Sequence, residues 1–331
     1  MTWLVQPRLI NDVFSDPGVF VDFRFGRRAL LFDLGDIHAL SPREVLRISH
    51  VFVSHTHMDH FVGFDRLLRL LLSRSAPLHL VGPEGFTEHV RHKLEAYTWN
   101  LLGRDAANFS ITAMEFVGGP LVGGSSFRAR EAFEPRAFVP PTLPEGAILD
   151  EEAFRIRAAV LDHGIPCLAF ALEEKLRINV HREGLDALGL PVGPWLNEAK
   201  RAVRLGKPDD TPVVVAADRS VPLGLLRAHA LRVAPGQKIA YVVDAAYHSA
   251  NVERIVALAH RADQLFIETA FLDADAGLAA ERRHLTAAQA GAIARAVEAG
   301  RVTPLHFSPR YLDREAELRR ELEIAIRGNS P

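Results

Sequence analysis

The stretch Ser54-His55-Thr56-His57-Met58-Asp59-His60 places three histidines and one aspartate within seven residues. The overlapping residues 48–57 are rich in β-branched and aromatic side chains and are predicted to form a strand. After this stretch the apolar residues recur with the period of a helix, at Phe61, Phe64, Leu67, Leu68 and Leu71. The cluster is therefore predicted to lie in a turn between a buried strand and a helix, so the fold must combine both kinds of element.

Strands and helices are mixed along the rest of the chain as well. Residues 105–180 are rich in predicted strands, and further on strands such as "KIAYVVDAA" alternate with helices such as "NVERIVALAHRA". Thr286 and Gln289 have the spacing of a capping box, at the start of a helix that we expect to terminate at Gly300. The simplest α/β architecture for this pattern is two packed mixed β-sheets with helices on the outer faces.

One segment differs from its surroundings. In residues 179–212 Gly and Pro are closely spaced and basic side chains gather. We interpret this segment as a basic insertion within a single domain that spans residues 1–331. Its cations could neutralise phosphates, and a solvated charged loop is the alternative interpretation.

Composition narrows the classes of protein that remain. The chain has 48% hydrophobic and 24% charged residues, which is usual for a globular protein. A net charge of −2 gives no overall basic field that would indicate nucleic acid, although it leaves room for a local basic patch. The single cysteine, Cys167, rules out an internal disulfide and a cysteine-based zinc site. With neither a signal peptide nor an apolar run of roughly 18–20 residues, we expect a cytoplasmic protein without membrane contact.

The donor types in the cluster indicate a metal site. His55 and His57 alternate at the end of a strand, so their side chains point the same way, and Asp59 and His60 follow on the turn. Imidazole and carboxylate together suit zinc, manganese or iron(II), and a set without thiolates is typical of a catalytic site. The alternative interpretation, a loop of surface histidines, is weaker because the cluster joins an apolar strand to an amphipathic helix.

Such a site needs further ligands from elsewhere in the chain. His163, Asp244 and His306 each end an apolar predicted strand. Side chains at strand ends on one edge of a sheet can meet in space. Taken singly, each has a structural explanation, as a turn residue or a hydrogen-bonded core histidine, but together with the cluster they are candidate ligands.

These motifs carry a family resemblance. "HTHMDH" resembles the His-x-His-x-Asp-His signature of the metallo-β-lactamase superfamily. The later segments "DHGIPCLAFALEEK", "LGLPVGP", "ETAFLDADAGLAAERRHLTAAQAG" and "HFSPRY" resemble its ribonuclease Z branch, whose members trim the 3′ end of precursor tRNA. The resemblance covers residues 28–312 and departs from the family's pattern in the N-terminal "QPRLINDVFSDPG" and at Ala245, where a threonine is usual.

The resemblance implies a metallo-β-lactamase αββα sandwich with a two-metal site. His55, His57 and His163 would hold one ion, most readily zinc, and Asp59, His60 and His306 a second, with Asp244 between them. Asp59 would also orient a metal-activated hydroxide. His284 matches a histidine that assists proton transfer, and Glu268 matches its acidic partner; a solvated histidine and a carboxylate that caps a turn are the alternatives.

Substrate contacts are the least specific part of the resemblance. Ser308 and Arg310 stand beside a predicted ligand and could contact a phosphate. The 179–212 segment, with Gly193 and Pro194, matches an arm that grips tRNA at a distance from the active site. Lys200, Arg201 and Arg204 of that arm could bind phosphates, and the family's mode of binding implies a homodimer.

Three functions follow as hypotheses. The leading one is a metal-dependent phosphodiesterase that removes the 3′ trailer of precursor tRNA. The second keeps the metals but acts on a small phosphodiester, thioester or lactone. The third is a non-catalytic, metal-stabilised RNA-binding protein, which a complete ligand set with a distal histidine argues against.

Overall fold

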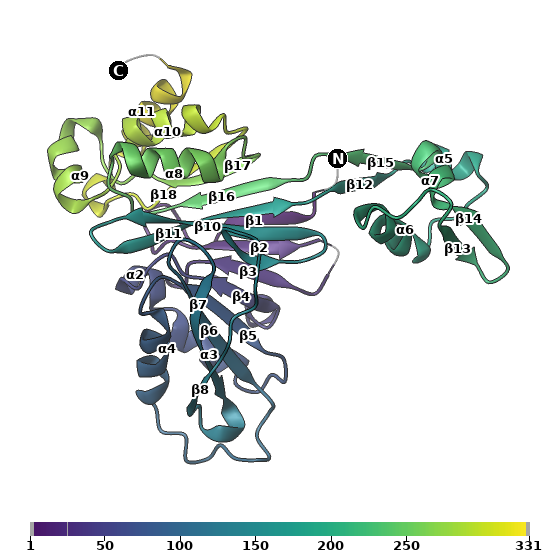
Figure 1. Cartoon of the computed structure of the whole chain (residues 1–331). Coiled ribbons are helices and arrows are strands. Elements are labelled where there is room, and N and C mark those ends of the chain that lie inside the picture. Colours follow the sequence, from purple (N-terminus) through teal and green to yellow (C-terminus); the bar gives the residue numbers. More distant parts are fainter. Residues whose placement is uncertain (1–2, 25, 329–331) are drawn as a thin grey trace. The chain divides into compact units, whose positions relative to one another are not determined.

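The computed structural model describes residues 3–24 and 26–328, and the chain divides into two compact units (Figure 1). The larger unit contains Val5–Asp150, Ile156–Leu172 and the chain from Lys238 onward. The smaller unit consists mainly of Glu173–Gln237.

The first sheet of the larger unit follows the chain in strict order from β1 to β8. Neighbouring strands are antiparallel except β3 to β6, which are parallel because helices connect them. The strands are β1 (Val5–Leu9), β2 (Val19–Phe23), β3 (Ala29–Phe32), β4 (Ile48–Phe52), β5 (Leu78–Gly82), β6 (Ser110–Phe116), β7 (Leu121–Arg128) and β8 (Pro135–Ala137). The helices are α1 (Pro42–Val45), α2 (Met58–Phe61), α3 (Phe64–Leu71) and α4 (Phe86–Glu95).

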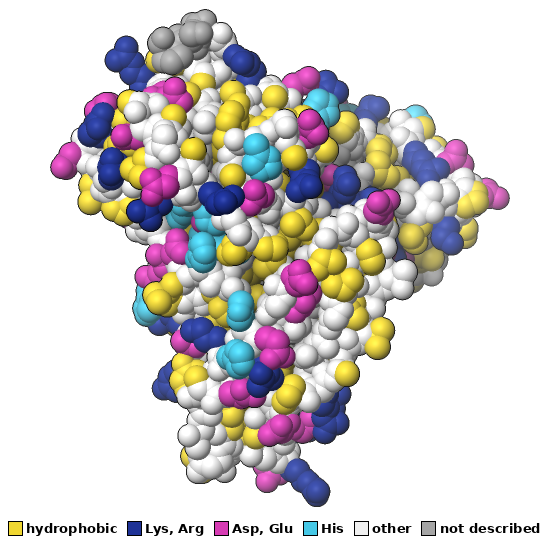
Figure 2. Space-filling view, turned by 60° about the vertical axis from the view of Figure 1, so that its left-hand side comes forward, with side chains coloured by type: hydrophobic (Ala, Val, Ile, Leu, Met, Phe, Trp, Pro, Cys, Tyr) yellow, Lys and Arg dark blue, Asp and Glu magenta, His cyan; other side chains and the backbone are white. Residues whose placement is uncertain are grey.

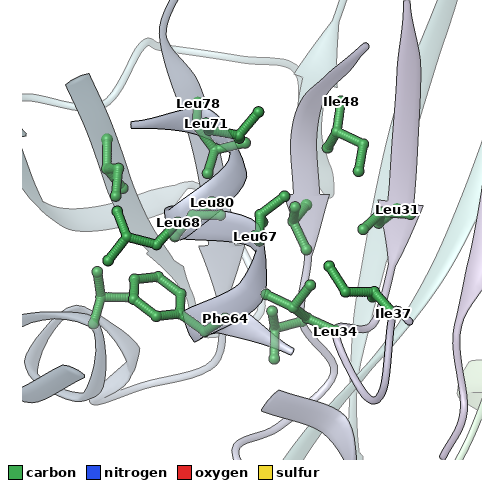
Figure 3. Packing of buried hydrophobic residues seen from close by; sticks show 14 of the residues in the cluster. Leu31, Leu34, Ile37, Ile48, Phe64, Leu67, Leu68, Leu71, Leu78 and Leu80 are labelled. Carbon is green, nitrogen blue, oxygen red and sulfur yellow. The ribbon is translucent and has the colours of Figure 1, made fainter. Parts of the chain in front are cut away.

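The apolar stripe of α3 forms the core on the outer face of this sheet. Phe64, Leu67, Leu68 and Leu71 recur at helical spacing and are all buried. Figure 3 shows them beside residues of the neighbouring strands and loops, among them Leu31, Ile48, Leu78 and Leu80. Burying each such side chain contributes about 1.5–3 kcal/mol, so this stripe fixes α3, and with it the preceding α2, against the sheet.

The second sheet has the order β18-β17-β16-β11-β10-β9. Its strands are β9 (Ala147–Asp150), β10 (Phe154–Asp162), β11 (Pro166–Glu174), β16 (Lys238–Val242), β17 (Gln264–Glu268) and β18 (Val302–Leu305). The last three run parallel, and helices follow them: α8 (Ser249–Ala259), α9 (Ala276–Arg282), α10 (Ala287–Val297) and α11 (Glu315–Arg327). Buried side chains of α8, α10 and α11 share a hydrophobic cluster with this sheet.

The start of α10 is as predicted and its end is not. Thr286 and Gln289 form the expected capping box. The helix stops at Val297, and Glu298 rather than Gly300 takes the left-handed conformation that closes it, with φ of 57°. The carbonyl of Val297 accepts a hydrogen bond from the Arg261 N–H. A tertiary contact therefore satisfies the helix end, which the position of a glycine in the sequence could not reveal.

Aromatic side chains fill the space between the two sheets. The Phe32 ring stacks on Phe170, with centroids 5.5 Å apart, and on Tyr241, with centroids 5.8 Å apart. The backbone N–H of Leu168 also donates to the Ser54 carbonyl. Two mixed sheets packed face to face with helices outside confirm the predicted α/β sandwich.

The smaller unit has its own core. Strand β12 (Arg177–Val180) pairs with β15 (Leu231–Ala234), and β13 (Pro212–Ala216) pairs with β14 (Arg219–Pro222). Helices α5 (Arg182–Ala187), α6 (Trp195–Arg204) and α7 (Leu223–His229) pack their apolar residues into one cluster. The predicted insertion, 179–212, lies inside this unit, which continues to Gln237.

Over the described part of the chain, no helix has the length and apolar character needed to cross a membrane.

Candidate metal centre

Every predicted metal ligand stands at the end of an element of the larger unit. His55 and His57 lie in the turn that follows β4, and Asp59 and His60 belong to α2, which begins right after that turn. His163 lies in the turn between β10 and β11. Asp244 follows β16, and His306 follows β18. Since these strand ends share one edge of the sandwich, the side chains converge although up to 251 positions separate them in the sequence.

The seven side chains form two groups of donors. Donor atoms of His55, His57, His163 and Asp244 lie within 4.8 Å of one another. Donor atoms of Asp59, His60 and His306 form a second group of the same compactness. These are the two sets that the sequence predicted for two ions.

Asp244 lies between the two groups. Its Oδ2 is 3.4 Å from His55 Nε2, 3.5 Å from His163 Nε2 and 3.3 Å from His60 Nε2. Its Oδ1 is 2.9 Å from His306 Nδ1. A single carboxylate thus faces donors of both sets, which is the position that a bridging ligand needs.

The donor atoms at the centre lack hydrogen-bond partners. The buried atoms His55 Nε2, His60 Nε2, Asp244 Oδ1 and His306 Nδ1 make no hydrogen bond of acceptable geometry among the described residues, although the last two face each other at 2.9 Å. Leaving a buried polar atom unpaired costs about 1–3 kcal/mol. Four such atoms aimed at one small volume fit divalent metal ions, because coordination would satisfy all of them.

The opposite ring nitrogens are held by hydrogen bonds. His60 Nδ1 donates to Asp33 Oδ2 at 2.8 Å, and His163 Nδ1 donates to the Arg283 carbonyl at 2.9 Å. His55 Nδ1 lies 3.1 Å from Ser54 Oγ. With the proton fixed on Nδ1, each Nε2 keeps its lone pair toward the centre, which is the usual arrangement of metal-binding histidines.

Asp33 is a site residue that sequence reasoning missed. It is fully buried at the end of β3 and accepts hydrogen bonds from the Ser54 N–H (2.6 Å), Ser54 Oγ (2.8 Å) and His60 Nδ1. It also accepts from the hydroxyl of Tyr241, at 2.8 Å, across the interface of the two sheets. The position of Asp33 at the end of an apolar strand could have identified it from the sequence, because the same feature identified His163, Asp244 and His306.

Three residues of the centre adopt strained backbone conformations. Asp33, Asp244 and His306 have φ of 61°, 46° and 58°, in the left-handed region that non-glycine residues seldom occupy. Such strain costs about 1–3 kcal/mol at each position and is typical of functional sites. The surrounding sheets hold these residues there, so the chain keeps the donors in place at the expense of local stability.

The buried charges shift the pKa values of the donors in opposite directions. Burial lowers the pKa of His55 to about 2, so this imidazole stays neutral. Burial also opposes protonation of His306, but the adjacent Asp244 carboxylate outweighs it and raises the pKa to about 10. Burial raises the pKa of the Asp244 carboxyl, but His306 and His60 reverse this and hold it well below its usual range. Without metal, protons therefore occupy part of the centre.

His284 and Glu268 form a pair that adjoins the centre, with donor atoms that lie within 4.8 Å of donors of Asp244 and His306. His284 Nδ1 donates to Glu268 Oε2 at 2.8 Å, and Glu268 Oε1 accepts from the Ala245 N–H at 2.6 Å. Burial lowers the pKa of His284, but the buried Glu268 carboxylate more than offsets this, so the pKa is raised above its ordinary value. The pair can therefore hold a proton at a histidine that also lines the pocket.

A pocket of about 400 Å³ opens over the donors. His57, Asp59, Asp244, His284 and His306 line its polar side, and Phe271, Leu278 and Phe307 line its apolar side. Ser308 and Arg310 lie at its wall as predicted neighbours of the site, and Arg310 pairs loosely with Asp275, at 3.7 Å. In the view of Figure 2, cyan histidine side chains follow one another down this face of the larger unit.

The other predicted substrate contacts belong to the smaller unit. Gly193 and Pro194 precede α6, whose Trp195 and Val203 lie in the core of that unit. Of its three predicted cations Arg201 is exposed, whereas Lys200 and Arg204 are half-buried. Arg201 Nε pairs with Glu152 at 2.8 Å. Burial and the nearby Arg204 lower the pKa of Lys200.

Comparison with known proteins identifies the family. No family model matches the chain. Over 310 residues it is 34% identical to the ribonuclease Z of Deinococcus radiodurans, covering 93% of this chain and 90% of that protein. The chain belongs to the ribonuclease Z family. The ribonuclease Z of Treponema pallidum is 28% identical over 307 residues, which cover 90% of this chain and 82% of that relative.

Solved structures agree with membership of the ribonuclease Z family at the level of the fold. The metallo-β-lactamase fold protein YhfI of Bacillus subtilis superposes with a TM-score of 0.54 at 15% identity, covering 97% of this chain and 93% of its own. The short form of human tRNase Z superposes with a TM-score of 0.51 at 18% identity, with coverages of 92% and 93%. The predicted family, metallo-β-lactamase fold and hydrolytic enzyme class are confirmed.

Proposed function

We propose that this member of the ribonuclease Z family removes the 3′ trailer of precursor tRNA at the pocket over Asp59, Asp244 and His284. The observation that carries the proposal is the two donor groups with Asp244 facing both of them, and the His284–Glu268 pair beside them. Such an arrangement suits hydrolysis of a phosphodiester, because it combines sites for two cations with a proton donor. The names of the relatives support the choice of substrate.

Two divalent ions fit the unpaired donors. His55, His57 and His163 would hold one ion, Asp59, His60 and His306 the other, and Asp244 both. When bound, the ions would activate a water molecule and neutralise charge on the phosphate. Zinc is our assignment because it favours imidazole and carboxylate ligands in catalytic sites, and manganese and iron(II) accept the same donors.

The protein's own groups orient the reactants and move the proton. The Asp59 carboxylate, which faces the pocket, orients the attacking water. As the new P–O bond forms, the P–O3′ bond breaks, and O3′ takes a proton from His284 Nε2. Glu268 holds the Nδ1 proton of His284 and favours the imidazolium form needed for this transfer.

Binding of the tRNA body is assigned to the basic insertion. Lys200, Arg201 and Arg204 of α6 would contact phosphates, and Gly193 and Pro194 would allow close approach of the backbone. We assign the active form to a homodimer, as the family resemblance implies, and its location to the cytoplasm. Analytical ultracentrifugation measures the oligomeric state, and a monomer that cuts precursor tRNA at the full rate would contradict the homodimer.

A cleavage assay with metal analysis tests the proposal. Zinc-loaded protein should cut a precursor tRNA after the discriminator base and leave a 3′-hydroxyl on the tRNA. EDTA treatment should abolish cleavage and zinc should restore it, whereas His57→Ala should stay inactive and bind fewer ions. Cleavage by metal-stripped protein would contradict the proposal. Turnover of bis-p-nitrophenyl phosphate or an acyl ester without any tRNA cleavage would favour the small-substrate alternative.

A further inference from the structure

A hollow of about 310 Å³ lies next to the metal centre, between the ligand turn and α4. It is lined by Thr56, Phe61, His89, His92, Lys93 and Ala96. Thr56 stands between the predicted ligands His55 and His57, and its Oγ1 lies 2.8 Å from His89 Nδ1. The hollow is therefore continuous with the turn that builds the site, and His57 itself lines the catalytic pocket.

A larger hollow of about 600 Å³ follows on the far side of an ion pair. It lies between α3 and the residues after α4, and Arg66, Arg69, Tyr97 and Trp99 are among the residues that line it. The walls of the two hollows are in contact where Lys93 Nζ lies 3.0 Å from Asp65 Oδ2, and at the consecutive residues Ala96 and Tyr97. We call the whole path from Thr56 to Trp99 the α3–α4 track.

The far end of the α3–α4 track carries two arginines outside any ion pair of the described residues, although the Asp36 carboxylate, hydrogen-bonded to His38, lies within electrostatic range of Arg66. Arg66 and Arg69 make no ion pair with any carboxylate that the structure describes, and Arg66 Nε is buried without a hydrogen bond. The other basic side chains of this region are neutralised, Lys93 by Asp65 and Arg91 by Glu88 and Glu95. The free positive charge of the track is thus concentrated at two arginines of α3.

Aromatic side chains stand beside these arginines. Tyr97 is 44% exposed, although large aromatic residues are usually covered. Its ring meets Trp99 edge to face, with centroids 5.8 Å apart, and Trp99 Nε1 donates to the Leu94 carbonyl at 2.8 Å. This hydrogen bond fixes Trp99, and the ring contact with Trp99 orients Tyr97 so that a planar group can stack on the exposed tyrosine ring.

We infer that the α3–α4 track binds the single-stranded 3′ trailer of the substrate, which is the RNA beyond the bond that is cut. Two guanidinium groups and an exposed aromatic ring that line the same hollow match the phosphates and bases of an unpaired strand. His89 and His92 line the hollow nearest the ligand turn, where their remaining ring nitrogens can offer N–H donors. The inference rests on the proposed function, which identifies the RNA as a precursor tRNA. In that RNA the trailer is the strand that follows the bond that is cut.

Direct binding tests the track independently of cleavage. The full-length, zinc-loaded protein would be titrated into a fluorescein-labelled oligoadenylate that lacks tRNA structure, with fluorescence anisotropy as the readout and a gel to verify that the strand stays intact. Tyr97→Ala should weaken binding about fivefold or more. The double variant Arg66→Gln/Arg69→Gln should lower the slope of log Kd against log salt by about 0.7 for each phosphate that it no longer neutralises.

Matched variants separate the track from general charge effects. Arg301→Gln/Arg320→Gln removes the same charge from exposed positions outside the track and should leave binding unchanged. Circular dichroism of each variant would verify folding. Equal weakening in the control pair, or an oligoadenylate affinity that Tyr97→Ala and Arg66→Gln/Arg69→Gln leave unaltered, would overturn the inference.

A second assay asks whether the bound strand is the trailer. Two precursor tRNAs would be compared, one with a one-nucleotide trailer and one with a long unstructured trailer. The track variants should raise KM for the long trailer about fivefold or more and leave kcat and the short substrate unchanged. Equal effects on both substrates would overturn the assignment to the trailer. If neither precursor is cut while the oligoadenylate still binds through the track, the proposed function fails and the single-strand site stands.

Discussion

At the scale of single residues, the centre is defined by which polar atoms have partners. Outward-facing nitrogens of His60 and His163 are hydrogen-bonded, whereas inward-facing Nε2 atoms of His55 and His60 are not. Asp33 contributes most to this order, since its carboxylate accepts hydrogen bonds from the predicted ligand His60, from Ser54 and from Tyr241 of the other sheet. The sequence contained Asp33 but gave no sign of its partners.

The raised pKa of His284 leads to a prediction about pH. If His284 must be protonated to donate to O3′, kcat/KM should fall as pH rises through its pKa. Glu268→Gln removes the carboxylate that raises this pKa, so the alkaline limb should move to lower pH. Profiles of kcat/KM against pH for both proteins would be measured with precursor tRNA. The exposed Glu253→Gln serves as the control, and an alkaline limb that stays in place in Glu268→Gln would contradict the role of the pair.

At the scale of elements, the site depends on helices that pack against the outer faces of the sheets. Gly291 of α10 marks the closest approach of two helices. A Cβ built there would lie 2.5 Å from Ala325 Cβ and 2.7 Å from the Leu322 carbonyl oxygen of α11. Only a hydrogen fits in this space, so the glycine sets the distance between α10 and α11. The helix pair in turn packs beside β17, which ends at Glu268.

We therefore expect opposite effects from two glycine substitutions. Gly291→Ala should force α11 outward and lower the free energy of unfolding by about 1–3 kcal/mol. Gly277→Ala in α9 has nothing within 4 Å of the new Cβ and should raise the free energy of unfolding by about 0.4–1 kcal/mol, because it restricts the unfolded chain. Urea denaturation followed by circular dichroism measures both. Equal stabilities would show that the contact between α10 and α11 can relax.

At the scale of the whole molecule, catalysis and tRNA binding are assigned to different units. All seven predicted ligands, His284 and Glu268 belong to the larger unit, and the basic insertion belongs to the smaller one. The chain enters and leaves the smaller unit at neighbouring points, since the Glu174 N–H donates a hydrogen bond to the Gln237 carbonyl at 2.8 Å. A short linker can therefore join Glu174 to Gln237 in place of the residues between them.

Replacing residues 175–236 with a short Gly-Ser linker tests this division. The shortened protein should still bind zinc and hydrolyse bis-p-nitrophenyl phosphate, because no ligand is removed. Its KM for precursor tRNA should rise at least tenfold, since the cations of the insertion no longer neutralise phosphates. Metal analysis by mass spectrometry and steady-state kinetics on both substrates are the measurements. Unchanged KM for precursor tRNA would refute the role of the insertion.

Much of the site was predictable because one rule applied to several residues. His163, Asp244 and His306 were singled out because each ends an apolar strand, and the structure brings all three to the 55–60 turn. The same rule also fitted Asp33, but an aspartate two positions before a glycine has a ready explanation as a turn residue. The α3–α4 track was not predictable, because Arg66 and Tyr97 look like ordinary exposed residues until the packing of α3 against α4 is known.

By itself the sequence determined the supply of donors and their places at the ends of strands, because hydrophobic periodicity reveals where an element stops. It also determined the capping box at Thr286, which depends on residues only three positions apart. Only the tertiary structure decided which strand ends share an edge, which nitrogen of each histidine faces the centre, and where unpaired cations and an exposed ring line up. Those features arise from contacts between residues far apart in the chain, whose pairing local patterns do not encode.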